Sequence, residues 1–211
     1  MNKRHILALS ALTALLSCAV ISCDRNDDET TPNFTTGFVT VFTGSDGIPG
    51  VLKNDYGNRY VIAGETEVLA PDTLYRMMCS YAFNSDSTVT ILQRVFAYSS
   101  RAVEYDDVDS LFRDDPVQIN SMYIGGGFLN ILMGIRVMNP DSKHTLGMVH
   151  VPSADSLIFT VHHDADGDGE GTTRYAYISM PLNGYGLGSG DTVFFRCRGY
   201  GKDYALKLLY R

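Results

Sequence analysis

Hydrophobic and polar residues alternate along most of this chain, and this period of two constrains the fold more than any other feature. Successive side chains of a β-strand point to opposite faces, so alternation marks strands that bury one face. The run Tyr75, Met77, Cys79 and Tyr81 is one example. Sustained helical periodicity is hard to find. The sequence therefore predicts an all-β protein.

The segments between the candidate strands carry turn residues, as in Gly44–Gly47 and Asn139–Ser142. Only residues 104–112 offer a short helical turn. Many short strands with Gly- and Pro-bearing turns are typical of sandwiches and barrels, not of parallel sheets with helices. The candidate strands are 38–42, 59–63, 74–83, 88–97, 117–123, 128–138, 145–151, 157–162, 174–180, 192–198 and 204–210.

Charged residues concentrate at 106–116, where we place a domain boundary. Residues 36–112 hold four or five candidate strands, which suits a small closed OB-like β-barrel. Residues 113–211 hold six or seven, which suits an immunoglobulin-like β-sandwich. The predicted order is a barrel followed by a sandwich.

The N-terminus has the pattern of a secretory signal, because Lys3 and Arg4 precede an apolar run over residues 6–21. This run is shorter than the roughly 20 apolar residues that span a bilayer, and an acidic stretch follows it. Two cysteines stand directly after a serine, as in the lipobox of bacterial lipoproteins. Cys23 is preferred to Cys18 because the apolar run ends at Cys23. We expect residues 1–22 to be cleaved and Cys23 to carry the lipid.

Residues 23–35 are polar and acidic, so we expect a flexible tether there. Its acidic cluster resembles an export signal of Gram-negative lipoproteins. The predicted location is the outer membrane, as a lipoprotein that faces the periplasm or is exposed on the cell surface. The predicted partner is the membrane itself, reached through the N-terminal lipid.

The net charge of the chain limits which other molecules it could bind. Removing residues 1–22 removes two of the 17 basic residues and none of the 24 acidic ones, which leaves a net charge of −9. Nucleic acids and anionic membrane surfaces attract clustered positive charge, so the composition argues against both. An envelope protein or a glycan is the remaining kind of partner.

Two cysteines remain in the folded part, Cys79 and Cys197. In an exported protein they could form a disulfide. Each, however, follows the inward parity of its own alternating run, which is typical of a small core residue. We expect two buried thiols, with a disulfide as the alternative.

Four short motifs resemble the NigD-like lipoproteins of Gram-negative anaerobes. One is the lipobox with its acidic tether. The others are a leucine-lysine-x-aspartate-x-glycine hairpin, a strand that ends in aromatic-leucine-asparagine-isoleucine, and a histidine-bearing loop. They lie at residues 51–58, at 114–119 with 127–131, and at 157–168. Phe128 stands where the family has tyrosine, and His163 and Asp164 stand in the loop motif. The resemblance implies an OB-like domain before a β-sandwich, and it implies no activity.

One loop suggests a cation. Asp164, Asp166 and Asp168 alternate before Gly169, which is how a calcium loop begins. Tyr175 stands where an EF-hand needs glutamate and the flanks are strands, so an EF-hand is rejected. A looser calcium turn and a plain hairpin connection remain, and the plain connection is favoured. Calcium is thus the one cofactor that the sequence allows.

Catalytic patterns are harder to find. The histidines at 144, 150, 162 and 163 lack the spacing of a zinc site, and Gly186–Gly190 does not match a serine-nucleophile elbow. Gly125–Gly127 fits a bulge or sharp bend, since no helix follows it. A sugar platform could use four tyrosines, Tyr175, Tyr177, Tyr185 and Tyr200, although strand tyrosines are more often half-buried.

The sequence thus predicts a non-enzymatic, membrane-anchored exported lipoprotein that binds or scaffolds something in the cell envelope. Its alternatives are a calcium-stabilised adhesion or glycan-binding module and an envelope hydrolase. A hydrolase would need two carboxylates, or a nucleophile and a base, converging in a cleft between the domains.

Overall fold

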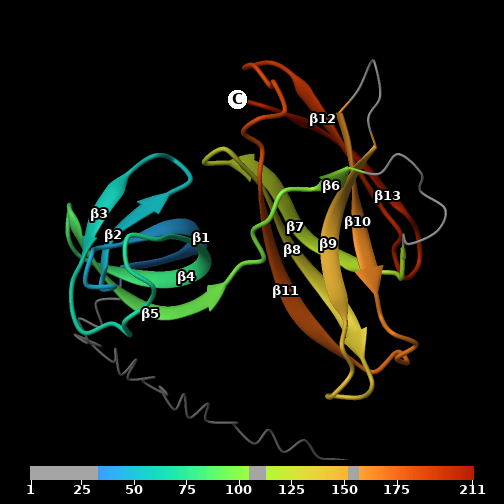
Figure 1. Cartoon of the computed structure of the whole chain (residues 1–211), viewed down its shortest axis with the longest axis horizontal. Coiled ribbons are helices and arrows are strands. Elements are labelled where there is room, and N and C mark those ends of the chain that lie inside the picture. Colours follow the sequence, from blue (N-terminus) through green and yellow to red (C-terminus); the bar gives the residue numbers. More distant parts are fainter. Residues whose placement is uncertain (1–32, 105–112, 152–156) are drawn as a thin grey trace, which may run out of the picture. The chain divides into compact units, whose positions relative to one another are not determined.

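The alternating segments form strands in the computed structural model, which describes residues 33–104, 113–151 and 157–211 (Figure 1). The described residues contain no helix, so the all-β prediction is confirmed. The strands are β1 (Phe34–Thr43), β2 (Pro49–Asn54), β3 (Arg59–Ile62), β4 (Leu74–Ser85), β5 (Thr88–Phe96), β6 (Val103–Glu104), β7 (Gln118–Gly125), β8 (Phe128–Val137), β9 (Thr145–Val151), β10 (Leu157–Asp164), β11 (Thr172–Pro181), β12 (Thr192–Cys197) and β13 (Tyr204–Leu209).

The first five strands close into a barrel in the order β1-β2-β3-β5-β4. All neighbours are antiparallel except β3 and β5, which run parallel. Closure gives each of these strands two neighbours. Inward residues such as Val39, Leu52, Met77 and Val89 are fully buried and fill the barrel. This is the small barrel that the strand count predicts.

The remaining strands form two sheets that share one core. One sheet has the order β13-β12-β10-β9-β6 and the other β11-β8-β7. Leu129, Ile131 and Met133 of β8 belong to the same buried cluster as Phe159 of β10 and Phe195 of β12. Two inner faces that bury alternate residues against one core make a β-sandwich.

The chain passes from the barrel to the sandwich between Phe96, where β5 ends, and Val103, where β6 begins to pair with β9. Within this passage Tyr98 bridges to Ile178 of β11. The boundary placed at residue 112 falls in 105–112, outside the described residues, as does most of the helical turn considered at 104–112. The domain limits remain a prediction.

The predicted signal peptide, most of the predicted tether and Cys23 also lie outside the described residues, and β1 begins at Phe34. In the part of the chain that the structure describes, no helix has the length and hydrophobicity needed to cross a membrane.

The structure contains two strands, β2 and β6, that the alternation did not predict. β2 begins with Pro49 and Gly50, which are turn residues by composition, and β6 is only two residues long. β2 and β3 nevertheless pair as the hairpin that the resemblance places at residues 51–58.

Cys79 and Cys197 are both buried and unpaired, each in its own core, so the two-thiol prediction is confirmed. Burial raises the pKa of each thiol to about 12. A thiol is a weak nucleophile while it stays protonated, so both cysteines are inert packing residues in the folded chain.

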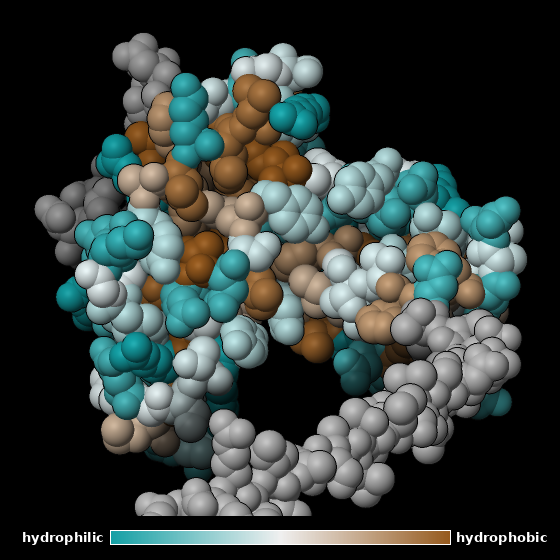
Figure 2. All heavy atoms as spheres, turned by 180° about the vertical axis from the view of Figure 1, so that it is seen from behind, coloured by the Kyte–Doolittle hydropathy of each residue, from teal (hydrophilic) through white to brown (hydrophobic). Residues whose placement is uncertain are grey.

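Large hydrophobic residues are also exposed, among them Leu92, Val95 and Phe96 on β5. On the face drawn in Figure 2, hydrophobic side chains lie in groups interrupted by polar ones. Exposed apolar residues are normal on folded proteins, so this surface by itself identifies no partner.

Candidate functional site

A buried arginine lies where barrel and sandwich meet. Arg76 of β4 has a side chain that is only 2% exposed, and its guanidinium stands 4.1 Å from the ring centre of Phe128. All five of its N–H groups face an acceptor. Nε donates to Ser179 Oγ (2.8 Å), Nη1 to Thr40 Oγ1 (3.1 Å) and Asp55 Oδ1 (2.9 Å), and Nη2 to Asn130 Oδ1 (2.9 Å) and Asp55 Oδ2 (3.4 Å).

Asp55 supplies the balancing charge from the turn between β2 and β3. Its carboxylate is the partner of Arg76, and Oδ2 also accepts from the Tyr123 hydroxyl (2.9 Å) and from Asn130 Nδ2 (2.9 Å). Its side chain is 7% exposed. Buried charges are tolerated when they are paired and hydrogen-bonded, and both conditions hold here.

Asn130 and Ser179 complete the cluster from the sandwich. They are opposite each other on β8 and β11, and the Ser179 hydroxyl donates to Asn130 Oδ1 over 2.6 Å. Both side chains are fully buried. We call Thr40, Asp55, Arg76, Tyr123, Asn130 and Ser179 the junction network.

The β7–β8 hairpin turn lies directly against Asp55. Gly126 has φ +62°, and a Cβ built on it would stand 2.5 Å from Asp55 Oδ1. A side chain there would be strained and would displace the carboxylate. The Gly125–Gly127 run therefore makes the sharp bend expected from the sequence, and it makes room for the junction network.

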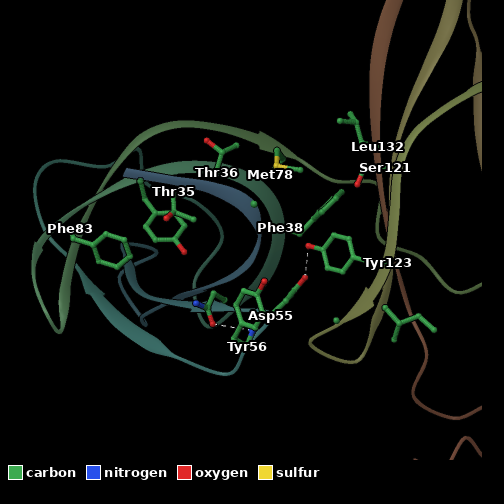
Figure 3. Close-up of a pocket in the computed structure, with 15 residues that line it drawn as sticks. Thr35, Thr36, Phe38, Asp55, Tyr56, Met78, Phe83, Ser121, Tyr123 and Leu132 are labelled. Carbon is green, nitrogen blue, oxygen red and sulfur yellow. Dashed lines mark hydrogen bonds between the residues drawn. The ribbon is translucent and has the colours of Figure 1, made fainter. Parts of the chain in front are cut away.

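A cavity of about 590 Å³ opens beside Asp55 and lies between β1, the β2–β3 turn, β4 and β7. Figure 3 shows Phe38 and Tyr123 next to each other at its wall, with the Tyr123 hydroxyl directed at Asp55. Their ring centres are 6.3 Å apart. Burial, and then the Asp55 charge, raise the pKa of Tyr123 above its ordinary value. The walls are therefore aromatic rings, apolar side chains such as Met78 and Leu132, and neutral hydroxyl groups around one saturated carboxylate.

A second polar cluster lies at the opposite end of β8. His144 Nδ1 and His163 Nε2 are 3.0 Å apart, and the two rings stack with centres 5.3 Å apart. His144 Nε2 is 3.1 Å from Asp168 Oδ2, and His163 Nδ1 is 3.1 Å from the Asp115 carbonyl oxygen. We call this chain of contacts the histidine relay.

The family model described as the NigD-like C-terminal beta sandwich domain matches residues 101–202. Residues 101–202 of this chain therefore form a NigD-like C-terminal β-sandwich domain. The match includes the whole histidine relay and three members of the junction network, Tyr123, Asn130 and Ser179. Arg76 and Asp55 lie in the barrel that precedes it. The family resemblance inferred from the sequence is thus confirmed.

Solved structures share the fold over most of this NigD-like chain. A NigD-like immunity protein from Bacteroides caccae is 25% identical with a TM-score of 0.68, covering 82% of this chain and 91% of that one. A proposed toxin-related protein from Parabacteroides distasonis is 20% identical with a TM-score of 0.71, covering 84% and 93%. A proposed lipoprotein from Bacteroides fragilis is 13% identical with a TM-score of 0.62, covering 85% and 99%. No curated protein matches this chain in sequence.

The aspartates of the candidate calcium loop have other roles in this NigD-like chain. Asp164 Oδ1 accepts from the backbone N–H of Asp166, which has φ 52°. Asp168 accepts from the backbone N–H groups of Met138, Asn139 and Gly169 and contacts His144. Within 33–104, 113–151 and 157–211, no group of three His, Cys, Asp or Glu residues could hold a metal ion. The calcium turn remains a prediction.

Three of the four tyrosines considered as a sugar platform pack or bond at separate places, and the fourth is exposed. Tyr177 packs edge-on against Phe38, and Tyr185 against Phe159. Tyr200 accepts from the Arg136 backbone N–H (2.7 Å). Tyr175 is 61% exposed. The aromatic walls of the cavity come instead from residues that the sequence did not single out.

The sequence also missed the junction network and the pairing of the two histidines. Arg76 stands at the outward parity of its strand, where a charged residue normally faces water. Arg76 is the one charged residue of β4, and Asp55 and Asn130 are the aspartate and the asparagine of two of the family motifs, but nothing in the sequence links the three. His144 and His163 are 19 residues apart, a spacing typical of no known site.

Proposed function

We propose that this chain is a lipid-anchored, non-catalytic binding protein of the cell envelope, and that its ligand occupies the cavity beside Asp55. The observation that carries the proposal is the chemistry of the cavity walls. At about 590 Å³ the cavity has the size of typical ligand sites, which are largely apolar with a few polar groups.

Binding without turnover follows from the state of the charged groups. Every N–H of Arg76 is used, and the Asp55 carboxylate accepts from three different side chains. A general acid or base needs a proton or lone pair that reaches the substrate. The junction network is instead saturated, and its charges cancel. An uncharged ligand with an apolar or aromatic face suits such walls.

The Bacteroides caccae relative is named an immunity protein, and binding is also compatible with that role.

The experiment is a thermal-shift screen with neutral oligosaccharides and uncharged tetrapeptides. A compound at one hundred times its Kd stabilises the folded state by about 2.7 kcal/mol. Ser121 lines the cavity and is exposed, so Ser121→Trp should fill the cavity and abolish the shift. Asn120→Trp, next to it on β7 and outside the lining, is the matched control. A ligand that still binds Ser121→Trp would place the site elsewhere.

The anchor is tested separately by metabolic labelling with a clickable palmitate analogue. We expect label on the wild-type protein and on Cys18→Ala, and none on Cys23→Ala. Label that persists in Cys23→Ala would move the lipid to another residue. Fractionation of labelled cells then tests the proposed outer-membrane location.

A further inference from the structure

The first half of β1 is paired on one side only. β1 pairs with β4 from Phe34 to Phe42, but its pairing with β2 begins at Val39, because β2 ends at Asn54. Residues 34–38 therefore extend past the end of β2 and have no strand on that side among the described residues. A strand edge of this kind presents backbone N–H and C=O groups that no neighbouring strand uses.

The alternation of the backbone identifies the groups at this free edge. In an antiparallel ladder the N–H and C=O of one residue point to the same neighbour, and those of the next residue point the other way. Asn33, just before β1, accepts from the Phe83 N–H of β4, and Thr43 at the end of β1 donates to the segment that leads into β4. Odd-numbered residues of β1 therefore face β4. The backbone groups of Thr36 and Phe38 face the side from which β2 is absent.

At Thr36, the centre of this edge, both backbone groups are without a partner among the described residues. Only its side-chain hydroxyl is bonded, to Ser80 Oγ over 2.6 Å. The Phe38 N–H donates to the Tyr123 hydroxyl, which leaves the Phe38 C=O. The free edge thus offers a donor and an acceptor at Thr36 and an acceptor at Phe38.

The cavity beside Asp55 extends along both faces of this edge. On the barrel side it is lined by Tyr81 and Phe83, which pack in the barrel core. On the other side it is lined by Tyr123 and Leu132 of the sandwich (Figure 3). Successive side chains of a strand point to opposite faces. A strand laid along this edge would therefore place alternate side chains in the two halves of the cavity.

Gly37 leaves the space that the barrel-side half needs. It lies opposite Cys79 and has the same inward parity as Val39, yet a Cβ built on it would meet no atom within 4 Å. Its φ is not positive, so backbone conformation does not require a glycine there. Glycine weakens the interior of a strand, and it often marks the place where a ligand or another backbone approaches closely.

We propose that the ligand of this cavity is an extended polypeptide segment that adds to β1 as a strand along residues 34–38. The inference rests on the proposed function, because it names the ligand class of the same cavity. Backbone hydrogen bonds at the edge supply affinity, and the two halves of the cavity select alternate side chains. Asp55 is the one charged residue among those that line the cavity, and Arg76 neutralises it. The side chains of the segment are therefore uncharged.

A glycan matches this arrangement less well. The rings of Phe38 and Tyr81 are only 4% and 2% exposed, and the Tyr123 hydroxyl is bonded to Asp55. The unused groups are backbone donors and acceptors with the spacing of a strand, which a second backbone reproduces.

The test uses the uncharged tetrapeptides of the thermal-shift screen, capped at both ends so that they carry no terminal charge. The peptide with the largest shift is titrated into the folded full-length protein, and amide hydrogen exchange is followed by NMR. Exchange of the Thr36 amide should slow by about tenfold or more in the complex. Exchange of the Gly37 amide, which faces β4, should not change.

Thr36→Pro removes the N–H at the centre of the edge and keeps the pairing with β4, since the backbone of Thr36 faces away from β4. Thr36→Val is the matched control, because it loses the same hydroxyl and keeps the N–H. The Kd of the peptide should be on the order of tenfold higher in Thr36→Pro than in Thr36→Val. Equal values in the two variants overturn the proposal.

Gly37→Val tests the same proposal without proline. Valine suits a strand, so the Tm should rise, while its side chain fills the barrel-side half of the cavity. The Kd of the peptide should rise by about tenfold or more. Unchanged peptide binding in Gly37→Val overturns strand addition even if Thr36→Pro does not fold.

The remaining outcomes separate this proposal from the proposed function. Oligosaccharide binding that Ser121→Trp abolishes, without peptide binding, keeps the cavity as the ligand site and rejects strand addition. Binding of neither class rejects both. Slow exchange of the Thr36 amide without peptide also overturns the proposal. If that protection grows with protein concentration, a second copy of the chain occupies the edge, and otherwise the chain covers its own edge.

Discussion

The two polar clusters of this protein lie at opposite ends of β8 and solve one problem in different ways. Asn130 belongs to the junction network near the start of β8, and Val137 ends the strand beside the histidine relay, roughly 23 Å further along. Each cluster buries one carboxylate beside side-chain nitrogens. In the first the nitrogens belong to a guanidinium, which keeps its proton at every accessible pH. In the second they belong to an imidazole, because His144 Nε2 lies 3.1 Å from Asp168 Oδ2.

This difference separates a charged junction from a junction of ring nitrogens. Arg76 joins the barrel to the sandwich through a permanent cation, while the relay joins three connections through contacts of imidazole nitrogens. Four predictions test that contrast, and the largest concerns the permanent charge.

Arg76→Met should cost about 3–5 kcal/mol of unfolding free energy, since it leaves the Asp55 carboxylate buried without its cation. The measurement is urea denaturation at pH 7. Arg94→Met is the control, because Arg94 pairs with Glu67, which is 73% exposed, and such pairs contribute only about 0–1 kcal/mol. Equal losses in the two variants would show that burial adds nothing to the Arg76 pair.

Asn130→Ala should cost about 1–3 kcal/mol, because it leaves Arg76 Nη2 and the Ser179 hydroxyl without their shared acceptor. Urea denaturation again provides the measurement. Asn120→Ala, on the exposed side of β7, should cost less than about 0.5 kcal/mol. If Asn130→Ala lost no more than this control, the neutral half of the network would have no energetic role.

Tyr123→Phe should cost about 1 kcal/mol at pH 7, the net value of one hydrogen bond. The raised pKa of Tyr123 adds an alkaline signature. Above about pH 10 the unfolded tyrosine ionises while the folded one stays neutral, so stability falls as pH rises. The fall from pH 9.5 to 11 should be shallower in Tyr123→Phe than in wild type. Parallel curves would mean that Asp55 does not hold this hydroxyl.

The smallest effect concerns metal at the end of the sandwich that holds the histidine relay. We expect the Tm to be unchanged between excess chelator and added calcium, because Asp164 and Asp168 already accept from backbone N–H groups. Differential scanning calorimetry measures this directly. A calcium-dependent rise in Tm that Asp166→Asn abolishes would restore the calcium turn and would show that this end binds a metal.

The strands could be predicted from sequence because alternation reports a local property, the face that each residue presents. The same parity correctly predicts that Cys79 and Cys197 point into their cores. It failed for Arg76, since the outward face of β4 is covered by residues more than 50 positions away. Burial of that face depends on how the sandwich packs on the barrel, which no local pattern contains.

The relay was missed for a related reason. Asp168 has the spacing of a calcium ligand, and only the pairing of β9 with β10 brings His144 and His163 into contact. Each of the three residues has an ordinary local setting. Their contacts form only when the two connections lie side by side.

The junction network also bears on the order in which the protein assembles. Asp55 and Arg76 are 21 residues apart, and both belong to the barrel, whereas the sandwich contributes only uncharged groups such as Asn130 and Ser179. The barrel therefore contains both charges of the ion pair, so the pair can form before the sandwich docks. Neither domain has an uncompensated charge when the two are apart. Docking replaces water around the ion pair with the Asn130 amide and the Ser179 and Tyr123 hydroxyls.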